Sequence, residues 1–283
     1  MVTAQFPGGT AVSGLAVYDW ATQDGLCGGS PHVHTVCTEA YVVVGGTGSL
    51  QTLTRAGFKE TPLRAGGVVW FTPGTIHRAV NTDGSLRVVV VMANAGLPEA
   101  GDAVLTFPPE ILNDPQTYQT AASLGPGATS KAADTTDTTA ATDTSDTSDS
   151  SGTSGTPDTP DTPDTALAEA ARRRRDLAIS GFLRLRQCAQ DDDFAPLEAF
   201  YRQAGALVRE RVGQWRAIVD QGPAAALRRT QQQLDALAAG RTDHLLEAGL
   251  RAEQAPEPDD RAWGMCGRLD TYGLENPQQG TKG

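Results

Sequence analysis

Hydrophobic positions in the first hundred residues fall in short runs that glycine, proline or Asp-Gly separates. The runs follow one another at roughly 8 to 12 residues, are rich in Val and Thr, and none keeps a helical period for long. They are "TAVSGLAVYDW", "HVHTV", "EAYVVVGG", "GSLQTLT", "FKETPL", "GVVWFT", "HRAVNT" and "SLRVVVVM". This pattern predicts an all-β sandwich or barrel within residues 1–124, with one or two short helices in the closing "PPEILNDPQTYQTAASL".

A helical period replaces this pattern in residues 165–255, where apolar residues recur three and four positions apart. The expected helices are residues 165–189, a second that begins near Pro196 and ends at Gly222-Pro223, a third that ends near Gly240, and a short fourth in "TDHLLEAGLRAE". Four helices with short connections predict a small antiparallel α-helical bundle. Residues 256–283 show no periodicity, so we expect an irregular tail.

Between these two parts, residues 125–164 are of low complexity and contain almost no large apolar side chain. Such a stretch cannot bury enough surface to offset the entropy of ordering its backbone, so we expect a disordered linker. Residues 126–165 carry −7 of the net charge of −11, so the acidic balance describes the linker. Neither flanking part is basic overall, which argues against a nucleic-acid partner.

Several other signals bear on location and chemistry. No apolar run approaches the about 20 residues that a membrane span needs, and the N-terminus lacks the pattern of a signal peptide. We therefore expect a soluble, cytoplasmic protein without a membrane partner. The four cysteines show no CxxC spacing, so buried free thiols are expected. Three lysines against twenty arginines suggest a GC-rich bacterial genome.

The stretch "SPHVHTVCTEAYVVVGGTG" carries the candidate chemistry. His32 and His34 share one face of a strand, about 7 Å apart. Glu39 opens the next strand, where an antiparallel neighbour would bring its carboxylate beside the two imidazoles. His77, after a Pro-Gly turn in "FTPGTIH", is the candidate fourth ligand. Three imidazoles and one carboxylate suit a divalent transition metal such as iron, manganese, nickel, zinc or copper.

These residues resemble the two motifs of the cupin superfamily, G-x5-H-x-H-x3,4-E-x6-G and G-x5-P-x-G-x2-H-x3-N. The matching positions are His32, His34, Glu39 and Gly46 for the first motif, and Gly66, Gly74, His77 and Asn81 for the second. Leu26 stands where the first motif begins with glycine, and Pro73 is displaced by one position; neither is a ligand. The resemblance covers roughly residues 10–95. It implies a cupin jelly-roll barrel for that part and says nothing about the linker or the helical region.

The resemblance leaves the reaction open, because cupins include dioxygenases, isomerases, decarboxylases and sugar-binding regulators. Four protein ligands on a six-coordinate metal leave two positions for water, substrate or dioxygen, which is typical of a catalytic site. We therefore expect a metal-dependent enzyme of dioxygenase or isomerase type that acts on a small oxygenated molecule. The alternative is a non-catalytic small-molecule sensor with a helical interaction domain. The resemblance also makes a homodimer plausible.

Strand parity yields expectations for the surroundings of the site. Tyr41 shares a face with Glu39 and is the candidate catalytic residue that contacts substrate, although a tyrosine packed in the core fits the pattern equally well. Arg78 has the opposite parity to His77 and should point away from the cavity, and Asn81 should fix a loop. The run Arg172 to Arg175 sweeps around a helix, so we expect solvated helix surface there.

Overall fold

Two antiparallel β-sheets face each other in the computed structural model, which describes residues 6–125 and 163–272. The first sheet has the order β10 (Ala262–Trp263), β11 (Gly267–Thr271), β1 (Ala11–Val17), β8 (Arg87–Met92), β3 (Glu39–Gly45) and β6 (Val68–Phe71). The second has the order β5 (Gly57–Arg64), β4 (Thr47–Thr54), β7 (Ile76–Asn81), β2 (His32–His34) and β9 (Ala103–Leu105). The predicted jelly-roll sandwich is confirmed, and the predicted linker lies almost entirely outside the described residues.

The inner faces of the sheets form the core because side chains alternate along each strand. In β3 the side chains of Tyr41 and Val43 are buried, while Val42 between them is only half-buried. In β6, Trp70 is 71% exposed, whereas Phe71 turns inward and packs against the core. The strand β9, a short apolar triplet, was missed by the sequence prediction.

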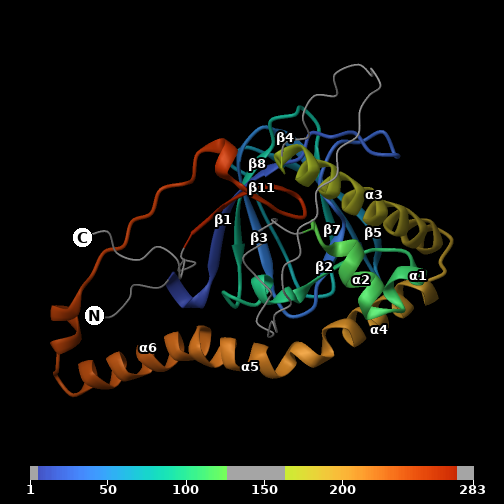
Figure 1. The fold of residues 1–283 in the computed structure, drawn as a ribbon. Coiled ribbons are helices and arrows are strands. Elements are labelled where there is room, and N and C mark those ends of the chain that lie inside the picture. Colours follow the sequence, from blue (N-terminus) through green and yellow to red (C-terminus); the bar gives the residue numbers. More distant parts are fainter. Residues whose placement is uncertain (1–5, 126–162, 273–283) are drawn as a thin grey trace, which may run out of the picture.

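Helices cover the sandwich from outside (Figure 1). The predicted pair of short helices is α1 (Pro109–Leu112) and α2 (Pro115–Ala122). The C-terminal helices are α3 (Pro163–Gln190), α4 (Ala195–Val208), α5 (Val212–Gln221) and α6 (Pro223–Ala238), with a short 3-10 turn Arg209–Arg211 between α4 and α5. The first and third predicted helices correspond to α3 and α6. The predicted second helix is divided into α4 and α5 by the 3-10 turn, and the predicted fourth is only a 3-10 turn, Asp243–Glu247.

The packing of these helices differs from the predicted bundle. Phe182 of α3 and Leu197 and Phe200 of α4 belong to the same buried hydrophobic cluster as the interior of the barrel. A Cβ added to Gly181 would lie 2.0 Å from the backbone oxygen of Thr106, so α3 lies directly against the chain that follows β9. α3 and α4 therefore bury apolar side chains against the barrel.

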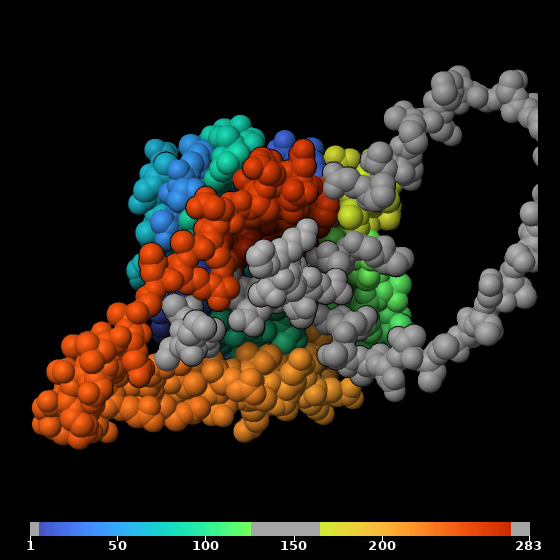
Figure 2. Space-filling model, turned by 60° about the vertical axis from the view of Figure 1, so that its left-hand side comes forward, coloured from blue at the N-terminus to red at the C-terminus, as the bar shows by residue number. Residues whose placement is uncertain are grey.

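Beyond α5, whose Trp215 is still buried in it, the helical region leaves this shared core. In Figure 1, α4, α5 and α6 follow one another along the base of the molecule. Figure 2 shows that the end of α6 and the turn after it project beyond the body. Leu227 and Leu234 of α6 are each 60% exposed. Apolar spacing alone predicted that these residues form helix, but it did not predict whether the helix would find a partner surface.

The expectation of an irregular tail in residues 256–283 is wrong for its middle part. The strands β10 and β11 form a hairpin, and β11 pairs with β1 from Ser13 opposite Thr271 to Val17 opposite Gly267. A pairing of residues so far apart in the chain leaves no local periodicity. The hairpin forms because the edge of β1 offers unpaired backbone groups.

The arginine run is also more buried than expected. Arg175 is 2% exposed and donates hydrogen bonds to the backbone oxygens of Trp20 and Ala21. The guanidinium of Arg172 lies over the Trp20 ring at 4.5 Å. The prediction of solvated helix surface is therefore wrong for Arg174 and Arg175, because α3 packs beneath the segment that follows β1.

Two further expectations concern the whole chain. All four cysteines are free thiols, with Cys37 and Cys266 buried and Cys27 and Cys188 half-buried. Within the described ranges, no helix combines the length and apolar character that spanning a bilayer requires.

Candidate metal centre

Three histidines meet on the inner face of one sheet. His32 in β2 pairs directly with His77 in β7, and His34 lies two residues further along β2 on the same face. The ring centroids are 4.2 Å apart for His32 and His77, and 5.1 Å apart for His32 and His34. The expected shared face of the first two histidines is therefore present, and the turn before β7 brings the third beside them.

Glu39 reaches the histidines from the opposite sheet. We expected its strand to pair with that of His32 and His34, but β3 pairs with β6 and β8 in the other sheet. Glu39 thus crosses the interior, and its Oε2 lies 3.3 Å from His34 Nε2 and 3.1 Å from His77 Nε2. One ligand atom from each of the four residues lies within 4.8 Å of every other. The set is enclosed: His32, His34, Glu39 and His77 are 3%, 4%, 5% and 0% exposed.

Hydrogen bonds at Nδ1 orient the imidazoles. The Nδ1–H of His32 donates to Ser30 O at 2.9 Å, and that of His77 donates to Thr75 O at 3.0 Å. A carbonyl oxygen can only accept, so its partner nitrogen carries the proton. The Nε2 atoms are left with free lone pairs. This is the arrangement in which histidine binds a metal while a second group fixes its ring.

His34 is held by a carboxylate that sequence reasoning missed. Asp102, fully buried just before β9, accepts from His34 Nδ1 at 3.2 Å and from the backbone N–H groups of Thr35, Val36 and Cys37. Burial would raise the pKa of Asp102, but the hydrogen bonds from His34 and Thr35 hold it well below its usual range. Neither motif includes this position. An aspartate directly before the apolar triplet "AVL" is the only sequence signal.

The charges in the cluster allow a second interpretation, a self-contained ion pair. Burial lowers the pKa of His34, but the Asp102 and Glu39 carboxylates outweigh it and raise that pKa to about 9. Burial would raise the pKa of Glu39, but His77 and His34 keep it well below its usual range. For His32, burial and the neighbouring histidines lower the pKa well below its ordinary value. A protonated His34 beside ionised Glu39 would satisfy that one contact.

The contact between Glu39 and His77 does not fit a simple ion pair. Glu39 Oε2 and His77 Nε2 are both buried, lie 3.1 Å apart, and have no hydrogen-bond partner among the described residues. In a neutral imidazole with its proton on Nδ1, two lone-pair atoms face each other, and a bound cation would satisfy both of them. Three imidazole nitrogens and one carboxylate oxygen are a donor set that suits a divalent transition metal. The residues therefore fit a metal ion.

A family model described as Cupin matches residues 3–118. The N-terminal domain belongs to the cupin superfamily. A comparison of the chain with curated protein sequences gave no match.

Several solved structures are similar to part of the chain, one of them described as containing a double-stranded β-helix domain. They include an uncharacterised protein from Klebsiella pneumoniae (20% identity, 32% of this chain and 71% of that chain, TM-score 0.25). Another is a Streptomyces PAC13 variant with uridine (18% identity, 32% of this chain and 63% of that chain, TM-score 0.25). A third is a TDP-fucose-3,4-ketoisomerase from Campylobacter jejuni (9% identity, 29% of this chain and 57% of that chain, TM-score 0.24). Similarity at this level assigns no activity to the chain.

Two aromatic side chains line the cupin site beside the ligands. The Phe71 ring lies 4.3 Å from the His77 ring, and the Tyr41 ring lies 6.4 Å from it. Tyr41 is 1% exposed, and burial together with the Glu39 carboxylate raises its pKa well above the usual value. Tyr41 is therefore next to the ligand set, as parity predicted.

The C-terminal hairpin also reaches this site. Cys266 Sγ lies 3.7 Å from Ser30 O and 3.9 Å from His32 Nδ1, and Ser30 N–H donates to Met265 O at 3.0 Å. Residues from the end of the chain thus support the backbone that fixes the first histidine. No sequence signal indicated this contact.

Other motif positions have structural roles. Arg78 points away from the cavity, as predicted, and forms a buried pair with Asp24 at 2.6 Å. Asn81 donates to Val17 O and accepts from Leu86 N–H, so it fixes a loop, also as predicted.

Proposed function

We propose that the cupin domain binds a divalent transition metal through His32, His34, Glu39 and His77. The metal would be iron, manganese, nickel, zinc or copper. We propose further that the chain is a metal-dependent enzyme of dioxygenase or isomerase type, which acts on a small oxygenated molecule. The observation that carries the metal proposal is the pair of buried atoms Glu39 Oε2 and His77 Nε2, which face each other at 3.1 Å without a hydrogen-bond partner among the described residues.

The chain's own residues would prepare the site for catalysis. A bound metal of this class supplies Lewis-acid or redox chemistry to a substrate that occupies its open positions. Asp102 keeps the His34 proton on Nδ1, so that Nε2 remains a ligand. Phe71 and Tyr41 exclude water from the His77 side of the cluster. At neutral pH the hydroxyl of Tyr41 is a neutral donor, suited to a substrate oxygen.

The first experiment is elemental analysis of protein purified without chelator, followed by a dioxygen-uptake screen and an isomerisation screen of oxygenated compounds. We expect near one equivalent of metal per chain. His77→Ala should abolish metal binding and turnover and leave the fold largely intact. His244→Ala is the matched control, because His244 lies in the 3-10 turn Asp243–Glu247, outside the cluster. Equal activity of metal-free and metal-loaded protein would refute the enzyme proposal.

One contact favours the alternative of a non-catalytic sensor. The Tyr201 hydroxyl of α4 donates to Gly74 O at 2.7 Å, and Gly74 N–H donates to His34 O at 2.9 Å. Through Gly74 the helical region is therefore in contact with the turn before His77 and with the strand of His34. A sensor would bind its ligand tightly, form no product, and change the hydrogen exchange of α4 when the ligand binds. Product formation in the screens would exclude it.

A further inference from the structure

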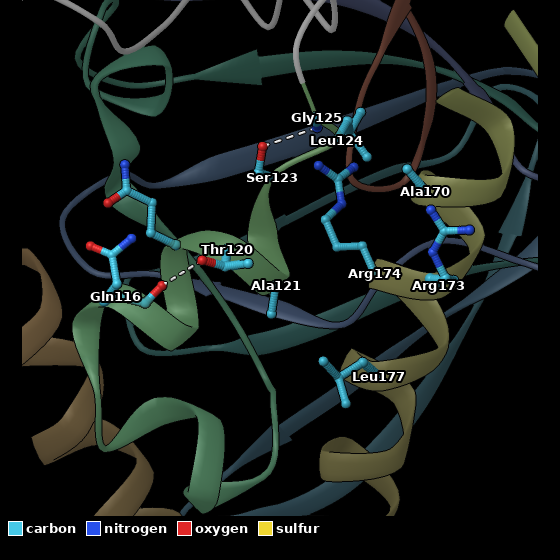
Figure 3. A pocket seen from close by; sticks show the side chains of 11 residues that line it. Gln116, Thr120, Ala121, Ser123, Leu124, Gly125, Ala170, Arg173, Arg174 and Leu177 are labelled. Atoms are coloured by element: carbon cyan, nitrogen blue, oxygen red, sulfur yellow. Dashed lines mark hydrogen bonds between the residues drawn. The ribbon is translucent and has the colours of Figure 1, made fainter. Parts of the chain in front are cut away.

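A second hollow lies outside the barrel, between α2 and α3 (Figure 3). Its volume is about 610 Å³, and it opens to solvent. Gln116, Gln119 and Thr120 of α2 lie on one side of it, and Arg173, Arg174 and Leu177 of α3 on the other. None of its lining residues belongs to the metal centre, so it is a separate feature of the molecule.

Arg174 gives this hollow an uncompensated positive charge. The residue is 8% exposed, and its guanidinium donates to Gly264 O at 2.8 Å and Ala122 O at 3.3 Å. Its Nε is buried without an acceptor, and among the described residues no carboxylate pairs with it. The other two buried arginines of the described residues differ, since Arg78 pairs with Asp24 and Arg175 with Asp176. Burying an unpaired charge is costly unless a counter-charge completes it.

The rest of the lining suits a ligand with both an anionic and an apolar part. Arg173, beside Arg174, is largely exposed, and its only carboxylate contact among the described residues is Glu169 at 3.6 Å. The Ser123 hydroxyl accepts from Gly125 N–H, so its own proton is left to donate. Leu177 supplies part of the apolar wall, as Figure 3 shows.

We propose that this hollow is a binding site for a small organic anion, either a carboxylate or a phosphate ester, that carries an apolar group. The anion would lie against the guanidinium groups of Arg173 and Arg174, and its apolar group against the wall that includes Leu177. The volume lies within the range of about 300 to 1,000 Å³ that is common for small-molecule sites. The site does not depend on the metal centre.

Isothermal titration calorimetry of the full chain with three probes tests the proposal. Phenyl phosphate and benzoate represent the two anion classes, and phenol is the neutral analogue. We expect at least one anion to bind with a Kd below about 1 mM, and phenol to bind about tenfold more weakly or not at all. The stronger of the two anions identifies the class. Binding of phenol as tight as that of both anions, or no binding of either anion up to about 10 mM, would overturn the proposal.

Variants locate the binding. Arg174→Gln should weaken binding of the anion about tenfold or more. Arg172→Gln removes the same charge from the same helix, but outside the hollow, and should leave the affinity for the anion unchanged. Ala121→Phe fills the hollow while keeping both Arg174 hydrogen bonds, so it tests the site even if Arg174→Gln fails to fold. Circular dichroism confirms the fold of each variant. An unchanged Kd in Ala121→Phe, or equal weakening by Arg172→Gln and Arg174→Gln, would show that the anion binds elsewhere.

Discussion

Replacing Asp102 by asparagine keeps the size of the side chain but removes its charge and one acceptor oxygen. Oδ1 accepts from Thr35 N, Thr35 Oγ1 and Val36 N, and Oδ2 accepts from His34 Nδ1 and Cys37 N. An amide oxygen at the Oδ1 position would keep three donors satisfied. The amide NH2 would then face two further donors, the Cys37 N–H and the His34 Nδ1–H.

The unpaired donors should lower both the stability of the protein and its affinity for metal. A hydrogen bond to a charged group contributes about 1.5–3 kcal/mol, and a buried donor without a partner costs about 1–3 kcal/mol. We therefore expect Asp102→Asn to lower the free energy of unfolding by about 3 kcal/mol. His34 escapes the clash by moving its proton to Nε2, which removes a metal ligand. Loss of such a supporting partner lowers metal affinity about 10- to 100-fold.

Denaturant titration of metal-free protein measures the first effect, and titration of metal against a competing chelator measures the second. Asp83→Asn is the matched control: Asp83 also accepts from a backbone N–H and a hydroxyl, those of Ser85, but in an exposed turn between β7 and β8. It should leave metal affinity unchanged. If Asp102→Asn bound metal as tightly as the parent, the carboxylate would not be what orients His34, and the argument from the histidine tautomers would fail.

Three further predictions concern the helices and the surface of the barrel. Gly181→Ala should lower the free energy of unfolding by about 1–3 kcal/mol in a denaturant titration, because the added Cβ would meet backbone atoms. Gly205→Ala is the control: an added Cβ there has nothing within 4 Å, so it should raise that free energy by up to about 1 kcal/mol. Equal effects of the two changes would contradict the close packing of α3. Asp24→Asn weakens the pairing of the buried Arg78 and should lower the free energy of unfolding by about 2–3 kcal/mol. Glu198→Gln, which weakens the exposed pair with Arg55, should lower it by only about 0–1 kcal/mol. Similar losses in the two variants would contradict a buried Arg78 pair. Burial raises the pKa of Tyr201 to about 12, from about 10 in an unfolded chain. The contribution of this shift to the free energy of unfolding is therefore complete below pH 10 and is lost as the pH rises toward 12. Across that window the parent should lose more stability than Tyr201→Phe, and parallel losses would refute this.

The barrel and its ligand set could be predicted because both follow from local pattern. Alternation placed His32 and His34 on one face, and a Pro-Gly turn before His77 marked the start of a later strand. Asp102 could not be found in this way. Its effect on His34 depends on β9 lying beside β2, with Ala103 opposite His34, and a contact between residues so far apart in the chain leaves no periodic signal.

The surroundings of the site escaped prediction for a related reason. An apolar stripe predicts that a helix buries one face, but it does not name the surface that covers it, so the stripe of Leu197 and Phe200 fitted a bundle as well as the barrel. The hairpin that carries Cys266 is defined by the free edge of β1, at the other end of the chain. Because that hairpin contacts the support of His32, and α4 contacts the turn before His77, the C-terminal region is part of the structure that holds the ligands. A chain shortened to the cupin motifs would therefore lack two supports of the candidate metal centre.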